Sequence, residues 1–179
     1  MGQQEIKKAL DGAAEYLTKN RADAKYTDSP ATARLASLDG LAVDVTGPDN
    51  ARLHADMPTS VGGTNSAPSP GWILRAAEAS CVATLIGMRA AQLEVALQEV
   101  EVTVDSESDD YGILGLSDDV PAGPLSTRII VRIAAAPPAG VTANTPAQLR
   151  EIVDWAVAHC PVVDAVRRAV PINLEVTIA

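Results

Sequence analysis

Residues 62–70 read GGTNSAPSP, and the stretch that follows them, residues 71–88, reads GWILRAAEASCVATLIGM. Ser69 is a favourable helix N-cap, and Pro70 suits the first helical position, where no backbone N–H is needed. The second stretch is rich in alanine and holds no further proline, so helix is its preferred conformation. The sequence therefore predicts a glycine-rich loop, a sharp helix start at Pro70 and one long helix.

The predicted helix lacks a charged face, because no residue between Glu78 and Arg89 is charged. A helix that is apolar all round is typical of a buried one. The uncharged run is shorter than the ~20 residues that cross a bilayer, so we interpret it as a core helix and expect no membrane association. In a chain of this size, a helix covered on every side indicates that a second subunit helps to bury it. Cys81 lies in the middle of this helix.

Composition limits the possible classes of function. The chain has 179 residues, of which 47% are apolar, so it is long enough for one domain with a real core. A net charge of −9 argues against nucleic-acid binding and against an anionic membrane surface. Residues 3–8 read QQEIKK and contain no apolar signal core, so we expect a cytoplasmic protein.

The remaining chain predicts a mixed α+β domain. Asp39-Gly40 is a hairpin signal between two β-like runs, and a third run follows, so a β-meander leads into the long helix. Helices and strands do not alternate strictly, which excludes a doubly wound α/β fold. We expect an N-terminal helical extension over residues 1–28 and one domain over residues 29–179. The other expected helices are residues 3–18, 145–159 and 161–168, and the expected strands are residues 32–38, 41–45, 52–57, 97–104, 111–116, 126–134 and 171–179.

The two cysteines are the strongest candidates for chemistry. Two cysteines in a chain without an export signal are typical of thiols with a redox or catalytic role. Cys160 precedes a helix that begins at Pro161, where the helix dipole favours a thiolate. For Cys81, burial and the acidic Glu78 one turn earlier both raise the pKa, so activation requires a cation from elsewhere in the fold. Alternatively, Glu78 holds such an arginine, or Cys81 is only a small buried hydrophobic residue. The candidate cations are Arg34, Arg52, Arg167 and Arg168.

Two other possible sites are weaker. The loop GGTN (62–65) could bind an anion through its backbone N–H groups, but no Gly-Lys-Ser/Thr follows, so a tight turn is preferred. His54 and His159 could form a zinc site with the cysteines, but no metal-binding spacing supports one. We therefore expect no metal and no bound cofactor.

Three pieces of the sequence together resemble a known family. They are GGTN (62–65), APSPGWILRAAEASC (67–81) and HCPV (159–162). As a set they are similar to the OsmC/Ohr family of osmotically inducible and organic hydroperoxide resistance proteins. The resemblance covers about residues 30–179 and leaves the N-terminal helix outside.

The resemblance implies a fold, an assembly and an activity. The fold is OsmC-like: a β-meander, a long central helix, a second half of the sheet and a C-terminal helix pair, assembled as an intertwined homodimer. The activity is that of a thiol peroxidase, which protects against oxidative stress by reducing organic hydroperoxides. Carried over to this chain, Cys81 is the peroxidatic cysteine and Cys160 the resolving one, with an external dithiol of the lipoyl type as reductant.

Two positions depart from the family pattern. Gly71 stands where peroxidase members carry a glutamate, and Leu38 stands where the hydroperoxide-resistance branch carries an arginine. Glu78 and either Arg34 or Arg52 are the residues that could substitute for these partners. The alternative is an OsmC-like protein without efficient peroxidase activity that binds a small apolar ligand at the dimer interface.

Overall fold

The computed structural model describes residues 2–136 and 145–178. The chain forms two compact units, which are described separately here. The meander unit is Ala9–Ala77, and the thiol unit consists of Met1–Lys8 together with Glu78–Ala179. Helix and antiparallel sheet are both present, so the predicted α+β class is confirmed. The expected boundary at residue 28 stays a prediction.

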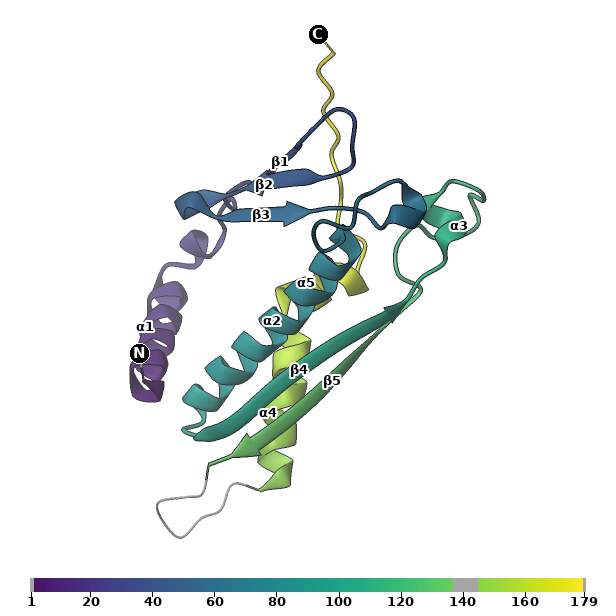
Figure 1. The fold of residues 1–179 in the computed structure, drawn as a ribbon. Coiled ribbons are helices and arrows are strands. Elements are labelled where there is room, and N and C mark those ends of the chain that lie inside the picture. The colour runs from purple at the N-terminus through teal and green to yellow at the C-terminus, as the bar shows by residue number, and fades with distance from the viewer. Residues whose placement is uncertain (1, 137–144, 179) are drawn as a thin grey trace. The chain divides into compact units, whose positions relative to one another are not determined.

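The meander unit holds the three strands expected before the long helix (Figure 1). Strands β1 (Thr32–Leu35), β2 (Val43–Thr46) and β3 (Arg52–Ala55) pair antiparallel in chain order, which confirms the β-meander. The unit also contains most of α1 (Gln3–Lys19), three short 3-10 turns and the first two turns of α2 (Pro70–Gln92). All four residues of β1 are exposed, so this sheet contributes little core of its own.

The thiol unit is built on one long hairpin. Strands β4 (Leu97–Glu107) and β5 (Ser126–Ala135) pair antiparallel, and their alternate residues form one apolar and one charged face. The rest of α2, with α4 (Pro146–His159) and α5 (Pro161–Arg167), packs on the apolar face (Figure 1). The fully buried core of the unit consists of Val82, Ile86, Ala90, Val95, Ile152, Ala156, Cys160 and Val163.

The opposite face of the hairpin carries ion pairs between the two strands. Arg128 of β5 binds Asp105 of β4 at 2.5 Å, and Arg132 lies 3.3–3.4 Å from Glu101 and Glu99. All of the acids on this face therefore belong to β4, while β5 supplies the arginines. The expected strand over residues 97–104 is therefore confirmed, and its acidic side chains share one face.

Helix α4 begins where its sequence indicates. The Thr145 hydroxyl accepts a hydrogen bond from the Gln148 N–H at 3.2 Å, and the Gln148 side chain accepts one from the Thr145 N–H at 2.8 Å. This reciprocal pair is a capping box, and Pro146 takes the first helical position. The expected helix over residues 145–159 is confirmed.

A single chain covers only one face of α2, and the predicted burial on every side with the help of a second subunit stays a prediction. Its buried residues are Glu78, Val82, Ile86, Ala90 and Ala91, most of which recur at every fourth position and form one stripe. Outside this stripe Trp72 is 51% exposed, and most other residues are only half-buried. One chain supplies a core for a single face of the helix, which leaves an apolar surface to be covered. Among the described residues, none of the helices combines the length and apolarity that crossing a bilayer requires.

Two expected strands are absent. Residues 111–116 do not form a strand; instead a short helix, α3 (Asp110–Ile113), occupies this region because the Asp109 side chain caps it by accepting the Tyr111 N–H. Residues 171–178 show the apolar alternation of a strand but have no regular secondary structure. Ile172 is 90% and Leu174 84% exposed. Alternation makes a segment suitable for a sheet, but a strand must also pair with another strand, and residues 171–178 pair with none of the described strands. Residue 179 lies outside the described part.

Candidate functional site

The glycine-rich loop before α2 is held by one buried carboxylate. Oδ2 of Asp56, a residue 2% exposed, accepts hydrogen bonds from the backbone N–H groups of Thr64 and Ser66, each at 3.0 Å, and from both of their hydroxyls at 2.6 and 2.9 Å. Its other oxygen accepts the Met57 N–H. These hydrogen bonds, led by the Thr64 hydroxyl, lower the pKa of Asp56 well below its usual value. The N–H groups that could have bound an external anion are thus taken by the chain itself, which supports the tight-turn interpretation.

Steric constraints favour glycine at both positions 62 and 63 of this loop. Gly62 has a φ of 90°, in the region that residues with a Cβ rarely adopt. A Cβ on Gly63 would lie 1.8 Å from the carbonyl oxygen of Met57, so the loop passes too close for any side chain. The loop then leads to Ser69, whose hydroxyl accepts the Trp72 N–H at 3.2 Å as the predicted N-cap. The start of the cysteine-bearing helix is therefore set by the loop and its cap.

The structure brings Cys81 and Cys160 together within the thiol unit. Cys81 lies on α2, and Cys160 lies at the junction of α4 and α5, which packs against α2 in the core. Both thiols belong to one core, where Cys160 is close enough to raise the pKa of Cys81, and both are free rather than disulfide-bonded. Residues 79 positions apart in the sequence thus form one dithiol pair.

Backbone N–H groups at the start of α5 face both sulfur atoms. The Val163 N–H donates to Sγ of Cys160 at 3.5 Å, which makes Cys160 the N-cap of α5, as the Cys-Pro sequence predicts. The neighbouring Val162 N–H donates to the sulfur of Cys81. Residue spacing does not reveal this second contact, because the contact depends on how α2 packs against the α4–α5 junction.

The environment of Cys81 raises the pKa of its thiol. Burial is the largest cause, followed by the hydrogen bond with Cys160, while the Val162 N–H acts in the opposite direction. The prediction that burial raises this pKa is confirmed. Within the described part of the chain, no arginine contributes to the shift in the pKa of Cys81. A thiolate at Cys81 therefore needs further stabilisation.

Glu78 is placed by α2 three residues before Cys81, in the buried stripe of the helix. Its side chain is 1% exposed, which is rare for a carboxylate in a single chain. A buried carboxylate beside a thiol pair is suited to hold a cation at that place. Neither position that departs from the family pattern supplies a charged group. Gly71, the second residue of α2, has no side chain, and Leu38 is 92% exposed.

Arg34 and Arg52 lie on the β-meander. Arg34 is opposite Asp44 and Arg52 is opposite Thr46, so the register places both arginines on the same face of this sheet. On that face Oδ1 of Asp44 is also 2.9 Å from Nδ1 of His54. The two arginines belong to the meander unit, and their role toward Cys81 stays a prediction. Of the other two candidates, Arg168 forms an ion pair with Asp164, and Arg167 ends α5.

The histidines have partners that do not include the thiols. His54 contacts Asp44, and His159 stacks on Trp155 with ring centroids 4.3 Å apart while its Nδ1 contacts the Trp155 carbonyl oxygen at 2.8 Å. Within residues 2–136 and 145–178, no three His, Cys, Asp or Glu side chains gather in a way that could hold a metal ion.

A family model for OsmC-like proteins matches residues 63–175, which is more than half of the chain. The chain therefore belongs to the OsmC-like protein family. The match begins at the glycine-rich loop and includes both cysteines, so it covers the whole dithiol pair. No curated protein sequence matches the chain.

Solved structures of this family share the fold at low sequence identity. An OsmC-like protein from Mycoplasma pneumoniae is 14% identical with a TM-score of 0.64, and the match covers 81% of this chain and 91% of that chain. An organic hydroperoxide resistance protein OsmC from Legionella pneumophila is 19% identical with a TM-score of 0.55, covering 80% and 91%. The organic hydroperoxide resistance protein OhrB of Bacillus subtilis is 18% identical with a TM-score of 0.50, covering 80% and 93%. These likenesses establish the OsmC-like fold.

Proposed function

We propose that this protein is a thiol peroxidase that reduces organic hydroperoxides, with Cys81 as the peroxidatic cysteine and Cys160 as the resolving cysteine. The observation that carries the proposal is the contact between the two thiols across α2 and the α4–α5 junction. Two thiols at hydrogen-bonding distance need little movement to form a disulfide, because the cysteines of a disulfide are close neighbours. Membership of the OsmC-like family agrees with a role in peroxide defence.

The reaction has three balanced steps. The Cys81 thiolate attacks one peroxide oxygen, the O–O bond breaks, and the alcohol leaves with a proton while Cys81 becomes a sulfenic acid. The Cys160 sulfur then attacks the Cys81 sulfur, forming the disulfide and releasing water. An external dithiol, proposed to be of the lipoyl type, reduces the disulfide by exchange and is itself oxidised. The chain needs no bound cofactor for these steps.

One contact supports the proposed activation of Cys81. The Val162 N–H already faces the Cys81 sulfur and stabilises negative charge there. We propose that an arginine, Arg34 or Arg52, supplies the remaining stabilisation and is held in place by Glu78. In this proposal the working form is a cytoplasmic homodimer in which the half-buried surface of α2 is covered by a second copy.

A second candidate function is favoured by a specific observation. The thiol pair is surrounded by aliphatic side chains of the core, and the pKa of Cys81 is raised rather than lowered. Such surroundings suit an OsmC-like protein that binds a small apolar ligand without efficient peroxidase activity. The two candidates differ in one measurable property, which is whether the thiols react with peroxide.

Intact mass and free-thiol count of the reduced protein, before and after one equivalent of cumene hydroperoxide, test the proposal. We expect both thiols to disappear together with a mass loss of two hydrogens. Cys160→Ser should stop at a sulfenic acid on Cys81, and Cys81→Ser should leave Cys160 unreacted. If both thiols survive an excess of peroxide, the peroxidase proposal is wrong and the ligand-binding candidate replaces it.

The same reaction tests the proposed arginines. Arg34→Gln or Arg52→Gln should slow the loss of thiols if that residue stabilises the thiolate. Arg128→Gln is a matched control, because Arg128 lies on the outer face of the hairpin in an ion pair with Asp105. Equal rates in all three variants would exclude both proposed arginines.

A further inference from the structure

One arginine of α2 binds α4 through its charge and through the face of its guanidinium. Nη2 and Nε of Arg89 donate to the same carboxylate oxygen of Glu151, at 2.6 and 3.2 Å. The guanidinium carbon also lies 5.1 Å from the ring centroid of Trp155, as in a cation–π contact. Glu151 and Trp155 are one turn apart on α4, so a single side chain of α2 contacts two successive turns of α4.

This contact is more protected from solvent than the ion pairs of the hairpin. The side chain of Arg89 is 24% exposed, whereas Arg128 and Arg132, which pair across the hairpin, are 71% and 68% exposed. The third guanidinium nitrogen of Arg89 donates to Oε1 of Gln92 at 3.4 Å, so each of its nitrogens has a partner. Exposed ion pairs contribute little, but a shielded pair held at every nitrogen keeps one geometry.

Helices α2 and α4 also carry the two thiols. Cys81 comes eight residues before Arg89, and Cys160 comes nine residues after Glu151. At ~1.5 Å per residue, these separations are about 12 and about 14 Å. The helices therefore run antiparallel, with the thiol pair at one end of their contact and the arginine contact at a matching distance along both. The buried residues between the two ends recur at every fourth position; they are Val82, Ile86 and Ala90 on α2, and Ile152 and Ala156 on α4.

A displacement of α4 along α2 would disturb both contacts together. Because hydrophobic burial is non-directional, similar aliphatic side chains at a regular spacing do not by themselves select one register. A charge-assisted hydrogen bond has a defined length and direction, so the pair of Arg89 and Glu151 does select one. A shift by one residue moves Cys160 by about 1.5 Å relative to Cys81, whereas the sulfur atoms of a disulfide must come within about 2 Å of each other. The pairing of the thiols therefore depends on the register of the two helices.

The same contacts extend to the residue next to Cys160. Trp155 stacks on His159 with ring centroids 4.3 Å apart, and Nδ1 of His159 is 2.8 Å from the Trp155 carbonyl oxygen. A carbonyl oxygen only accepts hydrogen bonds, so Nδ1 carries the hydrogen and the imidazole is fixed on the last turn of α4. Arg89, Trp155 and His159 thus form a continuous line of contacts from α2 to the end of α4.

We infer that Arg89 is a positioning residue for the resolving step: by holding α4 in one register on α2, it keeps the sulfur of Cys160 facing that of Cys81. The inference rests on the proposed function for its role in the reaction, but the pairing of the thiols can be measured without a peroxide. Arg89 acts through α4 and is not a catalytic residue. Its loss should therefore weaken the formation of the disulfide and leave the attack of Cys81 on a peroxide unchanged.

The equilibrium of the thiol pair with glutathione tests this inference. In buffers of defined glutathione ratio, the pair passes two electrons to oxidised glutathione, which yields the Cys81–Cys160 disulfide and two molecules of reduced glutathione. Intact mass gives the oxidised fraction. Arg89→Gln should lower the equilibrium constant for disulfide formation about tenfold, which raises the reduction potential of this two-electron couple by about 30 mV. A role in overall stability alone would not change this constant, because it would destabilise both redox forms of the folded protein equally.

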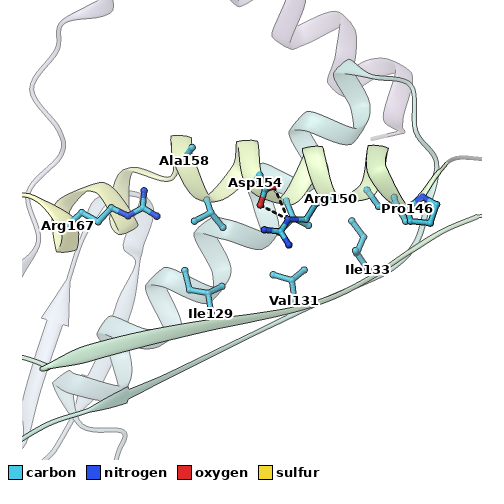
Figure 2. A pocket seen from close by; sticks show the side chains of 11 residues that line it. Ile129, Val131, Ile133, Pro146, Arg150, Asp154, Ala158 and Arg167 are labelled. Carbon is cyan, nitrogen blue, oxygen red and sulfur yellow. Dashed lines mark hydrogen bonds and ion pairs between the residues drawn. The ribbon is translucent and has the colours of Figure 1, made fainter.

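Arg150→Gln is the matched control. Arg150 pairs with Asp154 at 2.8 Å, and both residues belong to α4. Figure 2 shows this pair on the side of α4 that faces the groove above Ile129 and Val131 of β5. An ion pair within one helix does not fix that helix on α2, so Arg150→Gln should keep the equilibrium constant of the parent.

Variants of the partner residue test the contact from the other side. Glu151→Gln should shift the equilibrium as Arg89→Gln does, and the double variant Arg89→Gln, Glu151→Gln should add little to either, because the two residues act through one contact. Exchange of the charges, Arg89→Glu with Glu151→Arg, should restore part of the loss. The side chain of Glu151 is 46% exposed, so Glu151→Gln serves as the test if Arg89→Gln does not fold.

Two glutathione results would overturn the inference: equal constants for Arg89→Gln and Arg150→Gln, or no Cys81–Cys160 disulfide in the parent. A peroxide experiment tests the proposed function separately. Dimedone forms a thioether with a sulfenic acid and releases water, so with cumene hydroperoxide Arg89→Gln should give more Cys81 adduct than the parent at an unchanged rate of peroxide consumption. A parent that does not consume peroxide would overturn the peroxidase proposal, while the glutathione equilibrium would still decide the role of Arg89.

Discussion

Replacing Ile152 by alanine tests whether α4 and α2 share the core that holds the two thiols. Ile152 is on α4, is completely buried, and belongs to the same cluster as Cys160 and the α2 residues Val82 and Ile86. All of the side-chain atoms that alanine lacks are therefore in contact with the core and not with solvent.

The cost follows from the atoms removed. Alanine lacks about three carbon groups of isoleucine, each stabilising by about 0.8 kcal/mol when buried, which gives ~2.4 kcal/mol. Because the core relaxes only partly, the remaining cavity raises the expected loss in the free energy of unfolding to about 3–4 kcal/mol. In a chain of this length that corresponds to a decrease in melting temperature of roughly 10 °C. Ile152→Val should cost only about 1 kcal/mol.

Urea unfolding at fixed protein concentration measures this difference, with an unchanged slope m showing that the same surface unfolds. Ile130→Ala is the matched control, because Ile130 lies on the outer face of β5 and is 43% exposed, so it should cost under about 1 kcal/mol. If Ile152→Ala destabilises the protein no more than Ile130→Ala, the packing of α4 against α2 described here is wrong.

Three further predictions concern single groups. Cys160→Ala removes the hydrogen bond that helps raise the pKa of Cys81, so the pKa should fall, and iodoacetamide alkylation of Cys81 as a function of pH should shift to lower pH; an upward shift would contradict the assigned cause. The depressed pKa of Asp56 stabilises the fold above its unfolded value near 4, and this contribution is lost as pH falls toward the folded value. The difference in melting temperature between Asp56→Asn and the parent should therefore be greatest near pH 7 and shrink below pH 4, and a constant difference would argue against it. Thr145→Ala removes the capping-box acceptor of α4 and should cost about 1 kcal/mol in urea unfolding, whereas Thr145→Ser should cost much less.

Local signals in the sequence predicted the helix starts correctly. Ser69-Pro70, Thr145-Pro146 and Cys160-Pro161 each combine a side chain that accepts a backbone N–H with a proline that needs no hydrogen bond. Both partners of such a cap lie within four residues, so the local sequence alone contains the information. The same holds for the alternation of β4 and β5, whose two faces separate aliphatic residues from ion pairs.

The failures came from segments whose conformation depends on distant partners. The alternation of residues 171–178 indicates a strand, but nothing in the segment supplies the edge on which a strand must lie. For α2, the uncharged sequence predicts complete burial only with a second subunit, and one chain provides packing partners for one stripe, so this expectation stays a prediction. The strand expected at 111–116 is wrong for a local reason, because Asp109 caps a short helix at Asp110–Ile113.

Some features of the candidate site follow from local sequence, and others depend on tertiary packing. The sequence by itself determined the reactive groups, since the identity of Cys81 and Cys160, the cap position of Cys160 and the glycine-rich start of α2 follow from residue types at short spacing. Only the tertiary structure decided that the two thiols touch, that the Val162 N–H faces Cys81, and that Asp56 occupies the N–H groups of the loop. The two thiol contacts join segments that are distant in the chain, and the free energy that brings these segments together comes from burying aliphatic side chains across α2, α4 and the hairpin. Burial of this kind determines which faces of distant segments pack together. A short sequence motif therefore cannot predict these contacts.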